Sequence, residues 1–321
     1  SQNSRMNAKA IVFEAPLSLQ VRELALAPMG PTDITVAVDF SGISTGTERL
    51  LWEGTMPPFP GLAYPLVPGY ETVGRVVAIG NDVSTLAVGD TVFLPGSYAF
   101  QGVQNLFGGA GERLLAPQDR AVKLDSTLGA NGILLALAAT AHHVFTSGHS
   151  PTQLVYPDLI IGHGIMGRLL ARMVVAAGQP APVVWETQPI RQSGAVGYIV
   201  THPDDDPRKD YRCICDVSGD AAILNRVIPK MVAGGEVILA GFYKQDLSFA
   251  YAPAFMREAR IRVAAQWQKH DLDAVVAMFH GDGLSLEGLI THTEKAARAQ
   301  HAYEVAFGDP ACLKMVIDWR S

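Results

Sequence analysis

The sequence predicts an α/β protein of two domains, in which a domain built from β-strands precedes a doubly wound parallel sheet. The chain has 321 residues, about twice the length of an ordinary domain. Short apolar runs separated by turn residues fill residues 8–125, whereas apolar runs alternate with helical segments from residue 159 onward. Hydrophobic residues make up 48% and charged residues 17% of the chain, a composition that excludes a disordered or coiled-coil protein.

The first domain is predicted over residues 6–125. Its strands are short and closely spaced, a pattern typical of an all-β barrel or sandwich. They are predicted at residues 8–15, 17–24, 33–43, 73–80, 90–96 and 112–124. Asp125 or Ser126 can then cap a helix whose apolar residues recur at helical spacing through Phe145.

The second domain is predicted over residues 126–268 and has the alternating strands and helices of a parallel sheet covered on both faces. Strands are predicted at residues 159–162, 182–186, 198–200, 213–217, 236–242 and 261–265, with helices at 164–177 and 221–233. Residues 269–321 form a return segment with helices at 272–279 and 298–307 and strands at 289–292 and 313–318. Since this segment is too short for a third domain, we expect it to pack on the first one.

Composition also indicates which kinds of partner the protein binds and where in the cell it is located. The net charge of −6 and the lack of a basic run argue against nucleic acid as a partner. The uncharged residues 132–157 include histidines and prolines, so we expect no integral membrane segment. Three cysteines cannot build a disulfide framework, which favours the cytoplasm.

A glycine-rich motif predicts dinucleotide binding. The motif GHGIMG consists of Gly162, His163, Gly164, Ile165, Met166 and Gly167, follows an apolar strand and opens a helix. The first glycine allows the tight turn, the second lets the backbone approach the pyrophosphate, and the third lets helix and strand pack closely. The helix N-terminus then offers free N–H groups and the positive end of its dipole to the phosphates.

The acidic residue expected after this motif is Glu186, which ends the second strand of the domain. A carboxylate there accepts hydrogen bonds from the ribose hydroxyls and repels a 2′-phosphate, which favours NAD over NADP. Arg191 lies five residues further on. The Arg191 side chain either weakens the preference for NAD or is an ordinary solvated arginine with no effect on it.

Ser218 and Gly241 follow two further strands of the sheet. Because ligands bind at the carboxyl ends of strands in open parallel sheets, both residues are candidates for the nicotinamide side of the site. For Ser218, simple turn chemistry is an equal alternative.

The chain resembles the medium-chain dehydrogenase/reductase superfamily at SGISTGTE (41–48), PGYETVGRVVAIG (68–80), GHGIMG (162–167) and GGEVILAGFY (234–243). Within it the chain looks most like the bacteriochlorophyllide dehydrogenases, on segments that include YPLVPGYE (64–71), YRCICDVSGDA (211–221), FMREARIRVAAQWQ (255–268) and DPACLKM (309–315). The resemblance implies a GroES-like catalytic domain followed by a Rossmann domain. It also implies NAD-dependent oxidation of the 3-(1-hydroxyethyl) group of a bacteriochlorophyllide to 3-acetyl.

The resemblance also exposes a departure in metal ligands. At the positions where zinc enzymes of the superfamily carry a cysteine, a histidine and a third ligand, this chain has Ser44, Tyr70 and Ala136. These side chains do not make the thiolate and imidazole set that holds Zn²⁺. We therefore expect no metal.

Without zinc, the alcohol proton has to be taken by protein groups within hydrogen-bond reach. Matching to the family places the candidates Ser44, Thr47, Glu48, Tyr70 and Glu71 beside the nicotinamide, with His142 as a further proton relay. Each has an alternative: Tyr70 can merely fill the vacated metal site, Glu71 can be a structural carboxylate, and Thr47 and Glu48 can cap a helix. A histidine on an apolar helix can also be a satisfied core residue.

A bacteriochlorophyllide is a large apolar ring with a carboxylate, so its cleft should have aromatic walls and a cation. Candidates are Arg49, Trp52, Phe59, Tyr64, Phe100, Phe107 and Trp267. We expect a homodimer, as in many proteins of this fold, and a location at the periphery of the photosynthetic membrane. The alternatives are a zinc-free quinone or enone reductase and a non-catalytic protein that binds NAD and pigment.

Overall fold

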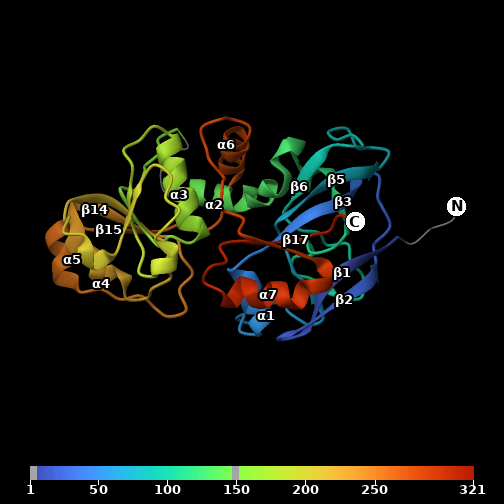
Figure 1. Cartoon of the computed structure of the whole chain (residues 1–321), viewed down its shortest axis with the longest axis horizontal. Helices are drawn as coiled ribbons and strands as arrows, with labels where there is room; N and C mark the ends of the chain where they lie inside the picture. Colours follow the sequence, from blue (N-terminus) through green and yellow to red (C-terminus); the bar gives the residue numbers. More distant parts are fainter. Residues whose placement is uncertain (1–5, 147–151) are drawn as a thin grey trace. The chain divides into compact units, whose positions relative to one another are not determined.

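The computed structural model describes residues 6–146 and 152–321, which form two compact units (Figure 1). The first unit contains the chain up to Leu135 together with Ile290–Ser321, and the second contains Ala136–Leu289. The domain boundaries predicted from the sequence, after residues 125 and 268, stay predictions. The compact units divide ten residues after the first of these limits and 21 after the second.

The first unit consists of two sheets. A seven-stranded sheet has the order β16-β17-β3-β5-β6-β9, with β8 also paired to β3, and a four-stranded sheet has the order β2-β1-β4-β7. The larger sheet contains β3 (Asp33–Ile43), β5 (Thr72–Ile79), β6 (Thr91–Leu94), β8 (Arg113–Pro117), β9 (Val122–Leu124), β16 (His292–Lys295) and β17 (Met315–Asp318). The smaller one contains β1 (Asn7–Ala15), β2 (Ser18–Ala25), β4 (Leu66–Val67) and β7 (Gln104–Asn105).

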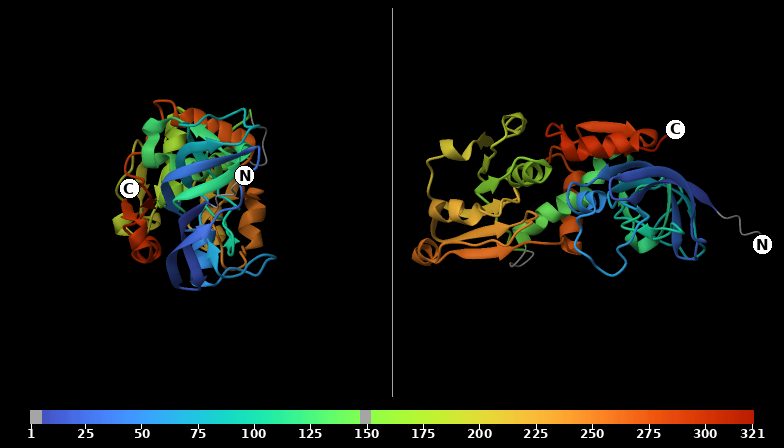
Figure 2. Two further views of the ribbon diagram at one scale, coloured as in Figure 1. Left: turned by 90° about the vertical axis from the view of Figure 1, so that its right-hand side faces the viewer. Right: turned by 90° about the horizontal axis from the view of Figure 1, so that it is seen from below.

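The end of the chain completes the larger sheet. β17 pairs antiparallel with β3, and Figure 2 shows this red segment in one unit with the blue N-terminal strands. The helices α1 (Thr47–Glu53) and α7 (Ala299–Gly308) bring Trp52 and Tyr303 against Phe13 of β1, with the Phe13 and Tyr303 ring centroids 5.1 Å apart. This aromatic group belongs to the apolar core of the unit.

The second unit is a six-stranded parallel sheet of order β12-β11-β10-β13-β14-β15, which confirms the predicted doubly wound fold. Its strands are β10 (Leu159–Ile161), β11 (Val183–Trp185), β12 (Ile199–Thr201), β13 (Tyr211–Asp216), β14 (Met231–Leu239) and β15 (Arg260–Val263). Its helices are α2 (Leu135–Thr146), α3 (Ile165–Ala176), α4 (Ile223–Val227), α5 (Tyr251–Arg257) and α6 (Lys269–Phe279). α3 packs against β10, and α4 and α5 pack against β14.

The helix predicted from residue 126 is confirmed, with a break in its first part. Asp125 caps it by accepting the Thr127 N–H at 2.9 Å. A 3₁₀ segment, Ser126–Leu134, precedes α2 and is interrupted at Gly129, whose φ of 54° lies outside the helical region. Ser126–Thr146 is long and apolar enough to cross a membrane by length and composition alone, but 67% of its most apolar window is buried inside the protein, as in a core helix.

Two predictions about elements are wrong in part, and one helix is missing from the predictions. The helix predicted at 221–233 ends early, because Pro229 lacks an N–H and Met231 already begins β14. The strand predicted at 289–292 begins only at His292, where its register with Met315 of β17 is set. α5 is absent from the prediction because its large apolar residues, including Tyr251, Phe255 and Met256, are exposed and follow no buried face.

Candidate active site

Five of the six predicted catalytic residues come together in the first unit. Ser44 follows the end of β3, Thr47 and Glu48 begin α1, and Tyr70 and Glu71 precede β5. These segments meet because β3 and β5 are antiparallel, with Ser41 opposite Thr72. We call these five residues the Tyr70 cluster.

The Tyr70 hydroxyl donates a hydrogen bond to the Ser44 Oγ, which also accepts the Gly46 N–H at 3.2 Å. The Tyr70 ring meets the Phe107 ring edge to face, with centroids 6.1 Å apart. Burial, helped by the negative charge of Glu71, raises the pKa of Tyr70 well above its usual value, and the nearby Thr47 hydroxyl opposes this. Tyr70 is therefore a neutral hydrogen-bond donor throughout the working pH range.

Glu71 forms a buried ion pair with Lys314, which is not among the predicted site residues. The Lys314 Nζ lies 2.8 Å from Glu71 Oε1 and 3.1 Å from the carbonyl oxygen of Ile43, and both side chains are almost fully buried. Lys314 stands directly before β17, so the pairing of β17 with β3 places it beside the cluster. This buried ion pair makes the structural-carboxylate interpretation of Glu71 better supported than a role as general base.

Glu48 is the acid of the cluster that forms no ion pair with any described residue. Its side chain is 1% exposed, and neither carboxyl oxygen has a hydrogen bond of normal geometry within the described part of the chain, although the Tyr303 hydroxyl is close. Burial, and next the charge of Glu71, raises the pKa of Glu48 from 4.5 to about 8. The helix-capping alternative is wrong, because the N-cap of α1 is Gly46 and none of the described side chains caps it.

The substitution Glu48→Gln should remove a pH-dependent loss of stability. Between pH 4.5 and about 8 the unfolded chain releases the Glu48 proton while the folded chain keeps it, so the folded state loses stability as the pH rises. Each pKa unit corresponds to about 1.4 kcal/mol, so the free energy of unfolding should fall by several kcal/mol across this pH range. Urea unfolding at pH 5, 6.5 and 8 should show a steeper decline for the wild type than for the variant. Parallel declines would contradict the raised pKa.

In the second unit the glycine loop connects β10 to α3. Gly162 has a φ of 108°, in the region that favours glycine, and Gly164 is the N-cap of α3. A Cβ on Gly167 would lie 1.8 Å from the Gly162 carbonyl oxygen, so no other residue fits there without a backbone shift. Ile165 is buried and Met166 half-buried in the first turn of α3.

Glu186 and His163 tie this loop to the next strand. The Glu186 carboxylate accepts the N–H groups of His163 and Gln188, each at 3.0 Å. The His163 ring bonds to the Arg191 carbonyl oxygen and to the Tyr198 hydroxyl, both at 2.6 Å. Burial lowers the pKa of His163 to about 4, so the ring is neutral and fixes the loop. The Arg191 guanidinium lies beside Gly164, with Nη1 3.5 Å from where a Cβ would be.

Ser218 and Gly241 lie at the carboxyl ends of β13 and β14, beside each other. Asp216 Oδ1 accepts both the N–H of Ser218, at 3.1 Å, and its hydroxyl, at 2.7 Å, and Oδ2 accepts the Tyr243 hydroxyl at 2.5 Å. Burial raises the pKa of Asp216. The Ser218 hydroxyl is thus engaged in a turn, and the sequence did not single out the Asp216–Tyr243 pair.

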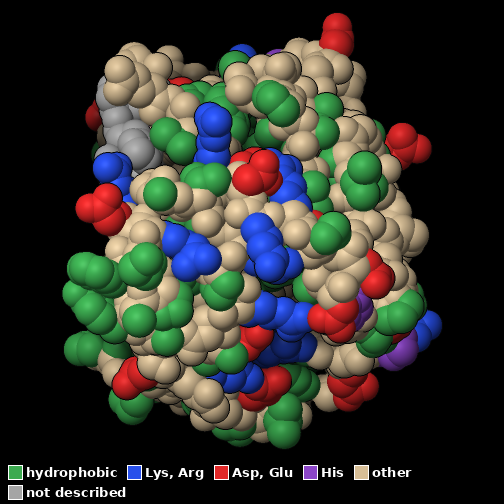
Figure 3. Space-filling view, turned by 90° about the vertical axis from the view of Figure 1, so that its left-hand side faces the viewer, with side chains coloured by type: hydrophobic (Ala, Val, Ile, Leu, Met, Phe, Trp, Pro, Cys, Tyr) green, Lys and Arg blue, Asp and Glu red, His purple; other side chains and the backbone are tan. Residues whose placement is uncertain are grey.

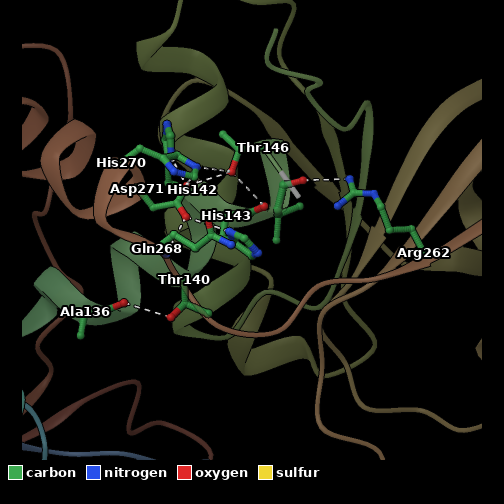
Figure 4. Close-up of polar contacts among 10 residues, drawn as sticks. Ala136, Thr140, His142, His143, Thr146, Arg262, Gln268, His270 and Asp271 are labelled. Carbon is green, nitrogen blue, oxygen red and sulfur yellow. Dashed lines mark hydrogen bonds and ion pairs between the residues drawn. The ribbon is translucent and has the colours of Figure 1, made fainter. Parts of the chain in front are cut away.

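His142 lies in the second unit, on α2, where its Nδ1 is 2.7 Å from Asp271 Oδ1 (Figure 4). Two of the predicted pigment contacts are wrong, because Trp52 and Phe100 are buried in the core of the first unit. Arg49 packs over Phe307 with its guanidinium 5.4 Å from the ring centroid. Among the remaining candidates Phe59 is exposed, and Tyr64, Phe107 and Trp267 are half-buried.

Comparison with known proteins agrees with this architecture. Residues 30–126 match the alcohol dehydrogenase GroES-like domain family. The chain is 48% identical to the 2-desacetyl-2-hydroxyethyl bacteriochlorophyllide A dehydrogenase of Rhodobacter capsulatus, over 98% of this chain and 99% of that protein. The protein of the same name from Cereibacter sphaeroides matches with the same identity and coverage.

Among solved structures, 2R,3R-butanediol dehydrogenase from Bacillus subtilis has a TM-score of 0.83 to this chain, covering 97% of this chain and 99% of that one at 19% identity. At this identity the likeness concerns the fold alone. The fold class and the resemblance predicted from the sequence are thereby confirmed. The chain belongs to the bacteriochlorophyllide dehydrogenase family of the medium-chain dehydrogenase/reductase superfamily and is an oxidoreductase that acts on a CH–OH group.

Proposed function

We propose that this enzyme oxidises the 3-(1-hydroxyethyl) group of a bacteriochlorophyllide to 3-acetyl in bacteriochlorophyll a biosynthesis, with NAD⁺ and without catalytic zinc. The observation that carries the proposal is the 48% identity over 98% of the chain to dehydrogenases named for that substrate. Their names describe a pigment with a hydroxyethyl group in place of acetyl, so loss of two hydrogens gives the acetyl product.

The second unit supports a nicotinamide dinucleotide. At Gly164 the absence of a Cβ lets the backbone approach a pyrophosphate, which would lie beside the Arg191 guanidinium, whose Nη1 is 3.5 Å from where a Cβ would be. The buried carboxylate of Glu186 would lie against the ribose and disfavour a 2′-phosphate, which is why we propose NAD rather than NADP. When bound, the nicotinamide ring accepts the hydride.

The Tyr70 cluster supports a protein route for the proton. Tyr70 is a neutral donor bonded to Ser44, so its hydroxyl can accept the substrate proton as it passes its own to Ser44. Glu71 is held by Lys314, whereas the pKa of Glu48 is about 8. Ser44 would in turn pass its own hydroxyl proton to ionised Glu48, the proposed final acceptor. This last transfer would require the Glu48 carboxylate, whose oxygens have no hydrogen-bond partner among the described residues, to turn toward the Ser44 Oγ. The cluster offers a zinc ion no thiolate or imidazole, so it does not fit one.

The decisive assay follows the anaerobic absorbance of the purified enzyme with NAD⁺ and the hydroxyethyl bacteriochlorophyllide. The expected result is NADH formation together with a red shift of the pigment's long-wavelength band, unchanged by EDTA and much slower with NADP⁺. Activity that EDTA abolishes would overturn the zinc-free mechanism. Reduction of quinones or enones with NADPH, without turnover of the pigment, would favour the reductase alternative.

We also propose a cytoplasmic enzyme that works at the periphery of the photosynthetic membrane, because its substrate is lipophilic. Vesicle flotation in the presence and absence of pigment would test this. Enzyme that stays wholly unbound under both conditions would contradict the peripheral association.

A homodimer through the edge of the parallel sheet is the proposed assembly. β15 pairs only with β14 in the described structure, and Ile261 and Val263 on it are exposed, Val263 by 70%. Figure 3 views the end of the molecule that carries α5 and β15 and shows apolar side chains at the surface there. An edge strand presents unpaired backbone N–H and C=O groups, which makes it a template for pairing with a second copy, and β15 adds two exposed apolar side chains that alternate with its arginines. In light scattering, Val263→Asp should shift a dimer to monomer, and the exposed Val88→Asp should not.

A further inference from the structure

Three histidines surround one buried carboxylate in the second unit (Figure 4). Asp271, in the first turn of α6, is 0% exposed. The Nδ1 atoms of His142 and His143 lie 2.7 Å from its Oδ1 and Oδ2, and the His270 Nε2 lies 3.5 Å from Oδ1. No residue of this group belongs to the Tyr70 cluster.

We propose that His143, His270 and Asp271 form a zinc-binding site that is separate from the catalytic centre. One donor atom from each residue lies within 4.8 Å of the other two. In a tetrahedral site with bonds of about 2.0 to 2.1 Å, donors are about 3.3 Å apart. His143 Nδ1 lies 2.7 Å from Asp271 Oδ2, and His270 Nε2 lies 3.5 Å from the other oxygen, Oδ1. To bind one zinc ion, the side chains would therefore have to rotate until both nitrogens and a single carboxylate oxygen are about 3.3 Å from one another.

The donor set is chemically suited to zinc. Two imidazoles and one carboxylate are the protein ligands of many Zn²⁺ sites that keep a fourth position for water. The His270 side chain is 34% exposed, which gives the ion a route in from solvent. To bind zinc through Nδ1, the His143 ring would be the neutral tautomer that carries its proton on Nε2, so the hydrogen bond between Nδ1 and Asp271 Oδ2 would be replaced by two bonds to the metal.

The surroundings of Asp271 hold the carboxylate in place for this role. Thr146 donates its hydroxyl to Oδ1 at 2.9 Å, and the Gln268 N–H donates to Oδ2 at 2.9 Å. With His142 as a third donor, the carboxylate is fixed by groups that would not themselves be ligands, as is usual around protein-bound metals. Zinc here would join α6 to α2 and stabilise the second unit.

The test uses the full-length protein, stripped with EDTA and then titrated with Zn²⁺ by calorimetry and thermal unfolding. We expect one zinc per chain at this site and a Tm increase of roughly 5 °C at a hundredfold excess over Kd. His270→Ala should weaken binding at least about tenfold and remove the Tm increase. The control is His301→Ala, a surface imidazole whose Nε2 lies 3.9 Å from Glu294 Oε1, which should bind zinc like the wild type.

A Co²⁺ titration identifies the ligands independently, because tetrahedral coordination gives strong visible absorption. His143→Gln and His270→Ala should each lose that absorption while keeping the wild-type Tm in EDTA to within a few degrees. Equal zinc affinity in wild type and His270→Ala would overturn the proposal, as would failure of the wild type to bind zinc. Dehydrogenase activity of the stripped protein tests the zinc-free mechanism separately, since neither histidine belongs to the proposed proton route.

Discussion

Replacing Tyr70 by phenylalanine should lower kcat by about a hundredfold or more, with little change in NADH binding. The substitution removes the hydroxyl that donates to Ser44 and keeps the ring that packs against Phe107. A positioned proton-transfer group contributes about 10² to 10⁴ in rate. The loss of one hydrogen bond should cost only about 1 kcal/mol of stability. The substitution should therefore lower kcat strongly and the free energy of unfolding only slightly.

Single-turnover kinetics with saturating NAD⁺ measure this effect, and fluorescence titration measures NADH binding. Tyr211→Phe is the matched control, because it removes a buried hydroxyl that donates to Asp206 at 2.6 Å in the second unit, far in sequence from the cluster. It should lose stability and keep kcat. A Tyr70→Phe enzyme with kcat within about threefold of the wild type would mean that Tyr70 merely fills the space of a metal site.

The pH dependence of the oxidation rate tests which residue of the Tyr70 cluster accepts the proton. If ionised Glu48 takes the proton, the rate of alcohol oxidation rises with pH through about 8, where Glu48 loses its own proton. In Glu48→Gln this rise should be absent and the rate low at every pH. A rise that persists in Glu48→Gln would assign the proton to another group.

The parts of the fold that the sequence predicts well are those with local signals. The parallel strands are apolar on both faces, and a glycine motif marks where the first of them turns into α3. Local sequence patterns do not predict β4 and β7, because a strand of two residues shows no alternation of apolar and polar side chains. They also do not predict the burial of Trp52, because it packs against Phe13 and Tyr303 from distant segments of the chain.

In the candidate site, too, local sequence patterns do not identify partners that come from distant segments. The segments that carry Ser44 and Tyr70 were selected by their motifs, and antiparallel pairing of β3 with β5 brings them together. The partner of Glu71, however, is 243 residues away at Lys314, and the partner of His142 is 129 residues away at Asp271. Lys314 lies in the segment DPACLKM (309–315), but the resemblance assigns that lysine no role, and Asp271 lies in none of the quoted segments. Only the tertiary structure therefore identifies both residues as partners.

Alanine substitutions in the glycine loop should abolish cofactor binding in two distinguishable ways. At Gly164 the new Cβ would have its nearest neighbour, Arg191 Nη1, at 3.5 Å, an ordinary contact, so the fold should be kept. The methyl group would then occupy the surface that the pyrophosphate approaches, and NADH affinity should fall at least about tenfold. At Gly167 the Cβ would lie 1.8 Å from the Gly162 carbonyl oxygen, so the loop itself must distort.

Gly167→Ala should therefore lose both NADH affinity and stability, by about 2 kcal/mol or more, because backbone has to move to relieve the overlap. Gly283→Ala is the control in the same unit, since its Cβ would have no neighbour closer than 3.9 Å. Isothermal titration with NADH and urea unfolding of the three variants test both effects. Tight NADH binding by Gly164→Ala would show that the pyrophosphate lies elsewhere, and a wild-type unfolding midpoint for Gly167→Ala would show that the loop can open without cost.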